Sequence, residues 1–125
     1  MHAFRLAAVA AVLATATPAF AHPKLLASTP APEAIVSNVT QATLSFNESL
    51  MAPLSGIDLA MTSMPGMAHH EPMKISGFQT SVGADGKTLT ATFPRPLPAG
   101  TYQLDWHAVA ADTHRVTGSV TFTVR

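Results

Sequence analysis

Methionine and histidine side chains crowd one short segment of the chain. Residues 61–73 read MTSMPGMAHHEPM and hold four of the six methionines. Thioether sulfur is a soft, neutral ligand that suits Cu(I), and it binds without losing a proton. Spacings of three between Met61, Met64 and Met67 let a loop wrap several sulfurs about one ion, and His69 or His70 adds a nitrogen. The segment therefore predicts a Cu(I) site.

Methionine in this segment has a second interpretation, as adaptable apolar filler or a binding surface. It applies most to Met61, which alternates with Ile57 and Leu59 as a strand residue does. Met64, Met67 and Met73 stand beside proline, glycine, histidine and glutamate, where core packing is a poor explanation. Metal binding is favoured for these three.

A different kind of ligand is predicted where the chain is expected to be cut. Residues 1–21 carry Arg5, an apolar run over 6–17 and the ending Ala19-Phe20-Ala21, which are features of a secretory signal peptide with an A-x-A cleavage site. Cleavage leaves His22 with a free α-amine and an imidazole, and these two nitrogens can chelate Cu(II). Pro23 has no N–H with which to extend the chelate, so further ligands must come from elsewhere.

Asp112 and His114 are the best candidates for those further ligands. Their spacing of two places both side chains on one side if the segment is extended. The alternative is a hydrogen-bonded turn followed by an exposed histidine. Metal binding is favoured only if the two ends of the chain meet, and the sequence pattern leaves that open.

Length, composition and charge limit the class of protein that can carry these candidate ligands. Residues 22–125 are enough for one domain with one core. The chain has no cysteine, so stability must come from packing and any soft ligand must be methionine. Seven Lys and Arg residues balance seven Asp and Glu residues, which makes nucleic acid an improbable partner. The apolar run near the start is too short for a membrane-spanning helix, and no later stretch supplies one.

Short runs of alternating apolar residues predict the elements that must position the ligands. Period two is typical of half-buried strands, and turn signals rich in Gly, Pro and Asp separate the runs. About seven strands are expected in a two-sheet antiparallel sandwich, immunoglobulin-like or cupredoxin-like. They are centred on residues 25–28, 44–46, 57–61, 73–82, 89–93, 102–106 and 120–124. The prolines and glycine of residues 61–73 predict an irregular loop there.

Three separated motifs resemble the CopC family of bacterial periplasmic copper-resistance and copper-trafficking proteins. They are the start His22-Pro23-Lys24-Leu25, the loop Met64-Pro65-Gly66-Met67 with Pro72-Met73, and Asp105-Trp106 followed by Ala110-Ala111-Asp112-Thr113-His114. The likeness covers nearly all of residues 22–125, including the closing Gly118 to Val124. The resemblance implies a Greek-key β-sandwich or barrel with Cu(II) at one end and Cu(I) at the other.

The resemblance also assigns residues and a partner. It implies Cu(II) ligation by His22, Asp112 and His114, and an inner-membrane partner of the CopD type. It implies a Cu(I) set of four sulfurs and one loop nitrogen, namely Met61, Met64, Met67, Met73 and either His69 or His70. Two departures stand out: the loop is one residue longer than the family pattern, and Arg115 replaces a common proline, which puts a cation near the Cu(II) ligands.

Three classes of function follow, of which the first is favoured. A periplasmic copper carrier uses ligand type to select the oxidation state and performs no catalysis. A copper monooxygenase also uses an amino-terminal histidine chelate, but Asp112 and His114 would fill the positions that oxygen chemistry needs open. A sandwich domain for adhesion or assembly predicts no tight copper binding.

Overall fold

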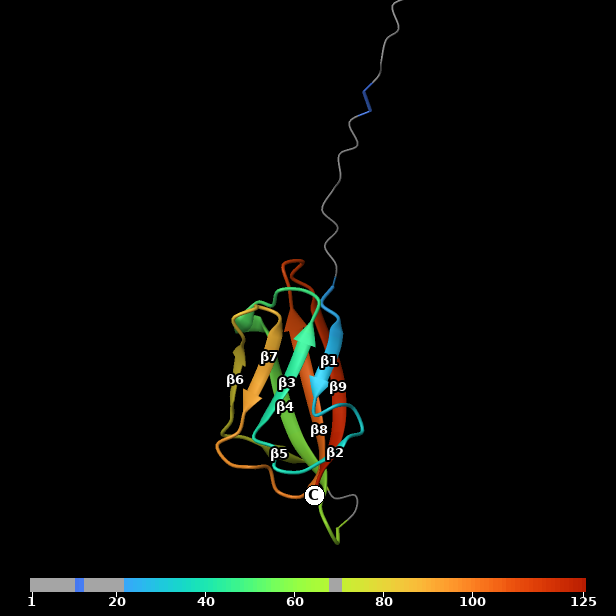
Figure 1. Cartoon of the computed structure of the whole chain (residues 1–125), viewed down its shortest axis with the longest axis vertical. Helices are drawn as coiled ribbons and strands as arrows, with labels where there is room; N and C mark the ends of the chain where they lie inside the picture. The colour runs from blue at the N-terminus through green and yellow to red at the C-terminus, as the bar shows by residue number, and fades with distance from the viewer. Residues whose placement is uncertain (1–10, 13–21, 68–70) are drawn as a thin grey trace, which may run out of the picture.

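The computed structural model describes residues 11–12, 22–67 and 71–125, and within these ranges the chain forms two facing β-sheets (Figure 1). The first sheet has the order β1 (Leu25–Thr29), β3 (Gln41–Phe46), β7 (Thr88–Thr92), β6 (Gln79–Val82). The second has the order β2 (Ile35–Val36), β9 (Arg115–Val124), β8 (Gly100–Val109), β4 (Gly56–Ser63), β5 (Met73–Ile75). One short 3-10 turn, η1 (Ala52–Leu54), precedes β4. The predicted all-β sandwich is confirmed.

The described ranges contain nine strands, where seven were expected. The predicted strand over 73–82 is broken at Gly77, whose φ of 81° lies in the left-handed region that glycine tolerates. The chain crosses there from β5 in the second sheet to β6 in the first. The other addition, β2, is only two residues long and pairs in parallel with β9.

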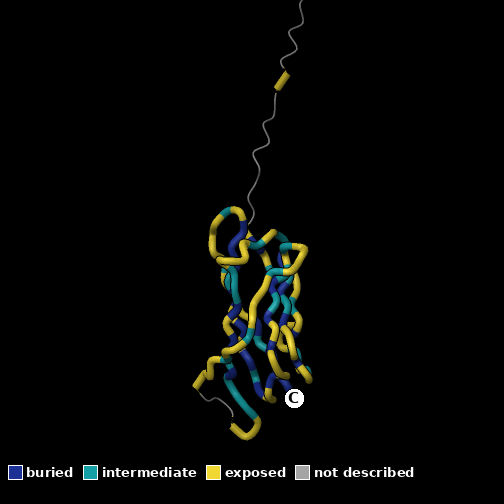
Figure 2. The backbone as a smooth tube through the Cα atoms, turned by 90° about the vertical axis from the view of Figure 1, so that its left-hand side faces the viewer, coloured by how far each residue is buried: buried dark blue, intermediate teal, exposed yellow. Residues whose placement is uncertain are grey.

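The core lies between the sheets and consists of the inward residues of the alternating runs (Figure 2). Leu44, Leu59, Leu89 and Leu104 are almost completely buried, as the period of two predicts. Trp106 packs edge-on against Phe46, with ring centroids 5.1 Å apart. Its indole lies across Gly118, where an added Cβ would come within 2.4 Å of the ring. Close packing of the indole therefore requires glycine at position 118.

Tyr102 links the start of β8 to the loop before it through a side-chain hydrogen bond. The side chain is fully buried, stacks on Phe122 and donates a hydrogen bond of 2.6 Å from its hydroxyl to the Pro98 carbonyl. Burial raises the pKa of the Tyr102 phenol, because the charged phenolate would lose its hydration. The folded protein therefore favours the neutral, hydrogen-bonded form.

Replacing Tyr102 with phenylalanine is expected to lower the free energy of unfolding at neutral pH by about 1 kcal/mol, the net value of one hydrogen bond. The wild-type chain is also expected to lose stability as the pH rises above about 10, because the phenol then ionises in the unfolded chain before it does so in the folded one. Urea titrations at pH 7 and above pH 10, followed by Trp106 fluorescence, check both effects. An identical alkaline loss of stability in Tyr102→Phe would contradict the account.

The sandwich has two distinct ends, which lie far apart. The segment just before β1 and the β8–β9 loop share the upper end in Figure 1, whereas the turn after β4 and the carboxyl terminus share the lower one. β8 pairs with β4 from Gly56–His107 down to Ser63–Thr101. A ten-residue strand such as β8 spans about 30 Å. Ligands at one end therefore cannot share an ion with ligands at the other.

No helix in the described ranges is long and apolar enough to cross a membrane.

Candidate metal centre

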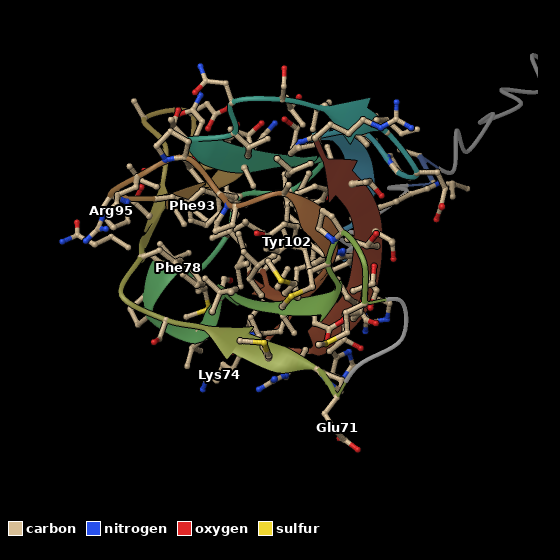
Figure 3. The ribbon with its side chains drawn as sticks, turned by 90° about the horizontal axis from the view of Figure 1, so that it is seen from below. Glu71, Lys74, Phe78, Phe93, Arg95 and Tyr102 are labelled. Atoms are coloured by element: carbon tan, nitrogen blue, oxygen red, sulfur yellow. The ribbon has the colours of Figure 1, made fainter. Side chains whose placement is uncertain are left out.

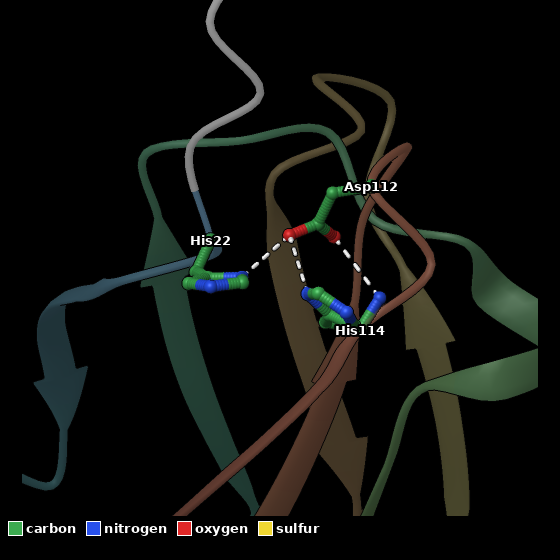
Figure 4. A group of neighbouring side chains, drawn as sticks. All are labelled: His22, Asp112 and His114. Atoms are coloured by element: carbon green, nitrogen blue, oxygen red, sulfur yellow. Dashed lines mark hydrogen bonds and ion pairs between the residues drawn. The ribbon is translucent and has the colours of Figure 1, made fainter.

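His22, Asp112 and His114 converge at the upper end of the sandwich (Figure 4). Nδ1 of His22 lies 2.5 Å from Oδ2 of Asp112, and Nδ1 of His114 lies 3.9 Å from the same oxygen. The two imidazole rings have centroids 5.0 Å apart. One potential ligand atom from each residue falls within 4.8 Å of the other two. The spacing suits three ligands around one ion.

Backbone pairing to the first sheet holds His22 in place. The Lys24 N–H donates to Oδ1 of Asn47 at 2.7 Å, and the Asn47 N–H donates to the Lys24 carbonyl at 3.2 Å. Leu25 then pairs with Phe46 as β1 joins β3. Pro23 is buried, so the residue after His22 is fixed by packing as well. The two residues between His22 and β1 are thus held against the fold.

Asp112 and His114 come from the opposite sheet, in the loop between β8 and β9. They lie in a tight turn, so the extended conformation considered from their spacing is wrong. The Thr113 N–H donates to the Ala110 carbonyl at 2.9 Å, and Thr113 has a φ of 64°. Oδ1 of Asp112 then accepts the His114 N–H at 3.2 Å. The turn leaves Oδ2 of Asp112 facing both histidines.

Burial differs sharply within this cluster. The Asp112 side chain is only 7% exposed, whereas the side chains of His22 and His114 are 61% and 73% exposed. The carboxylate therefore lies at the floor, and the imidazoles flank an opening to solvent. Two imidazoles with a carboxylate form a nitrogen and oxygen donor set, which suits Cu(II) better than Cu(I).

Several polar residues near this end do not join the cluster. Arg115 is exposed at the start of β9 and lines a cavity of about 210 Å³ on the outer face of the second sheet, together with Asp58, Asp105 and His107. The His107 ring packs over Gly56 and is half-buried. Within the described residues, neither His107 nor Glu48 belongs to a compact group with His22, Asp112 and His114.

The described part of the methionine segment lies at the opposite end, and it is more regular than the irregular loop expected. Residues 61–63 continue β4, and Met73 begins β5, directly opposite Met61. Met64 and Met67 exchange two backbone hydrogen bonds of 3.2 and 3.0 Å across Pro65-Gly66. Gly66 has a φ of 79°, as a turn with proline before glycine requires. Part of the segment is thus a two-residue hairpin.

The methionines differ in accessibility. Met61 is 6% exposed and belongs to the hydrophobic core, whereas Met67 and Met73 are 53% and 51% exposed and Met64 is half-buried. Figure 3 looks at this end and shows sulfur atoms between Tyr102 and the strand that carries Lys74. His69 and His70 lie outside the described residues. The placement of Met61 thus fits the interpretation as apolar filler. The side chains of Met67 and Met73, by contrast, are open to solvent.

The alternation of apolar residues did not predict the roles of two residues that position His22, Asp112 and His114. Asn47 anchors the segment after His22, and Thr113 turns the loop between Asp112 and His114. Asparagine after a strand is ordinary turn chemistry, and threonine is not a residue expected at positive φ. Only the folded backbone reveals these roles.

Comparison with known proteins gives one consistent family. The CopC domain model matches residues 25–125. "Copper resistance protein C" of Xanthomonas campestris pv. juglandis is 50% identical over 117 residues, covering 94% of this chain and 90% of the relative. The Escherichia coli protein of the same name is 43% identical over 114 residues, covering 91% and 90%. The crystal structure of PcoC, a methionine-rich copper resistance protein from Escherichia coli, is 42% identical with a TM-score of 0.76, covering 84% of this chain and all of PcoC.

Proposed function

This chain belongs to the CopC family, and from that premise we propose that it is a periplasmic copper carrier with separate sites for Cu(II) and Cu(I). The family resemblance that the motifs carried is confirmed. In the proposal, residues 1–21 are removed as a signal peptide, and residues 22–125 are the copper-binding domain. The protein binds and hands on copper without catalysing a reaction, with an inner-membrane protein of the CopD type as its partner.

The observation that carries the Cu(II) site is the meeting of His22 with Asp112 and His114. His22 lies 90 positions before Asp112 in sequence, and the segments that carry the two residues reach one point from opposite sheets. The 2.5 Å contact between His22 and Asp112, with His114 beside it, supports the proposal because it holds three potential ligand atoms at one point. After cleavage, the α-amine of His22 adds a second nitrogen from the same residue, completing a nitrogen-rich set that Cu(II) favours.

The Cu(I) site rests on the thioethers at the other end. Met64 and Met67 pair across the hairpin, and Met73 begins β5, where it pairs with the buried Met61. One histidine of the pair His69 and His70 completes the proposed set. Soft sulfur at one end and hard nitrogen and oxygen at the other assign each oxidation state to its own site, about 30 Å apart.

Replacing Met64, Met67 and Met73 together with leucine is expected to weaken Cu(I) binding by about 100-fold or more and to leave Cu(II) binding unchanged. Leucine keeps the apolar volume but removes the sulfur donors, and loss of ligand-shell groups costs 10–100-fold even in the outer shell. Competition titrations of a chain beginning at His22 with each ion, using a chromophoric chelator, measure both affinities.

Met51→Leu is the matched control. Met51 is 40% exposed and lies at the upper end, where its N–H donates to the Val109 carbonyl. This variant removes an accessible sulfur without touching the hairpin, so its Cu(I) affinity should equal that of the wild type. Wild-type Cu(I) affinity in the triple leucine variant would refute the methionine site.

A further inference from the structure

Thr113 has a backbone conformation that its residue type disfavours. Its φ of 64° lies in the left-handed region, where a β-branched side chain crowds the neighbouring carbonyl. Glycine, asparagine or aspartate normally occupies such a position. Two other non-glycine residues in the described ranges also have positive φ, Glu33 and Asn38, and neither is β-branched.

The position of this unfavourable residue is informative. Thr113 separates the two loop ligands, and the hydrogen bonds on either side of it fix their directions. Its own N–H closes the turn onto Ala110 at 2.9 Å, and the next N–H, of His114, returns to Oδ1 of Asp112 at 3.2 Å. The left-handed step at Thr113 lies between these two hydrogen bonds and is part of the backbone path that closes both of them.

We infer that Thr113 is a positioning residue: its left-handed backbone brings the Asp112 carboxylate and the His114 imidazole onto one ion. The inference rests on the proposed Cu(II) site and adds the element that builds it. This role requires a positive φ at position 113. It does not require the threonine side chain. Backbone strain held at a binding loop is a recognised means of preorganising ligands.

Three substitutions and one insertion separate the backbone from the side chain. Thr113→Gly and Thr113→Asn both permit positive φ, whereas Thr113→Pro fixes φ near −65°. Glycine and proline both lack the threonine hydroxyl, so their comparison tests the backbone: the sign of φ together with the Thr113 N–H that donates to Ala110. Insertion of one glycine between Thr113 and His114 keeps an exposed loop but breaks the hydrogen-bonded spacing of the two ligands.

Cu(II) affinity and the Cu(II) electron paramagnetic resonance spectrum are measured for each chain beginning at His22. Thr113→Gly and Thr113→Asn should stay within about threefold of the wild-type affinity with the same spectrum. Thr113→Pro and the insertion should bind about tenfold more weakly or worse, with a changed spectrum, because a smaller fraction of the loop is competent to bind. Cu(I) affinity and the urea midpoint serve as controls for folding. If Thr113→Pro fails to fold, the insertion variant tests the inference in its place.

Wild-type affinity and spectrum in the folded proline variant and in the insertion would overturn the inference. So would a loss in Thr113→Gly as large as in Thr113→Pro, because the side chain would then be the operative group. Absence of Cu(II) binding by the wild-type chain is a different result: it refutes the proposed Cu(II) site itself.

Discussion

Replacing Asp112 with asparagine is expected to weaken Cu(II) binding by about 100-fold or more while leaving the fold and Cu(I) binding intact. One carboxylate oxygen of Asp112 faces both histidines, at 2.5 and 3.9 Å from their Nδ1 atoms. Its charge is held almost out of solvent, where attraction to a divalent ion is least screened. Since removal of outer-shell partners alone costs 10–100-fold in metal affinity, loss of this central ligand should cost at least the upper value.

Asparagine is the informative substitution because it preserves the turn. Its side-chain oxygen can still accept the His114 N–H, which Oδ1 of Asp112 accepts at 3.2 Å. The variant therefore removes the charge and the anionic ligand without removing the hydrogen bond that shapes the loop. Competition titration with Cu(II) measures the effect, and urea unfolding checks that stability is retained.

Asp85→Asn provides the control for charge at the same end of the sandwich. Asp85 is also a turn carboxylate, and it accepts hydrogen bonds from the N–H groups of Lys87 and Thr88 and from the Thr88 hydroxyl. These bonds lower the pKa of Asp85, so it carries the same negative charge as a ligand would. Cu(II) affinity should not change in this variant. Equal losses in Asp85→Asn and Asp112→Asn would reduce the role of Asp112 to general electrostatics.

The core and the sheet class could be predicted from sequence because alternation is local. Leu44, Leu59, Leu104 and Val120 each report their own burial through their immediate neighbours. Two features could not be predicted: the crossing of the chain from one sheet to the other at Gly77, and the short parallel strand β2. Which strand pairs with which depends on residues far away in the chain. Gly77, in the middle of the predicted strand over 73–82, is the local trace of the first feature.

The candidate site divides in the same way. The residue types of His22, Asp112 and His114 indicated Cu(II) chemistry, but their meeting depends on Asn47 holding the first segment and Thr113 turning the second. Met61 illustrates the converse. Its spacing suited a ligand, and its alternation with Leu59 suited the core, where the structure places it.

A chain carrying one alanine before His22 is expected to lose about 100-fold or more in Cu(II) affinity relative to a chain that begins at His22. The extension converts the α-amine of His22 into a peptide nitrogen, which binds Cu(II) only after losing its proton, and it moves the free amine one residue away from the imidazole. Pro23 has no N–H that could replace the lost donor. Asn47 and the pairing of β1 with β3 lie beyond the extension, so the fold should be unaffected.

Paired titration of these two chains with Cu(II) and Cu(I) is the most direct test of the proposed site. We predict that the extended chain binds Cu(I) as the wild type does and binds Cu(II) about 100-fold more weakly or worse, since only the upper site contains the amino terminus. Equal Cu(II) affinity in the two chains would contradict an amino-terminal copper site, whatever the methionines at the other end bind.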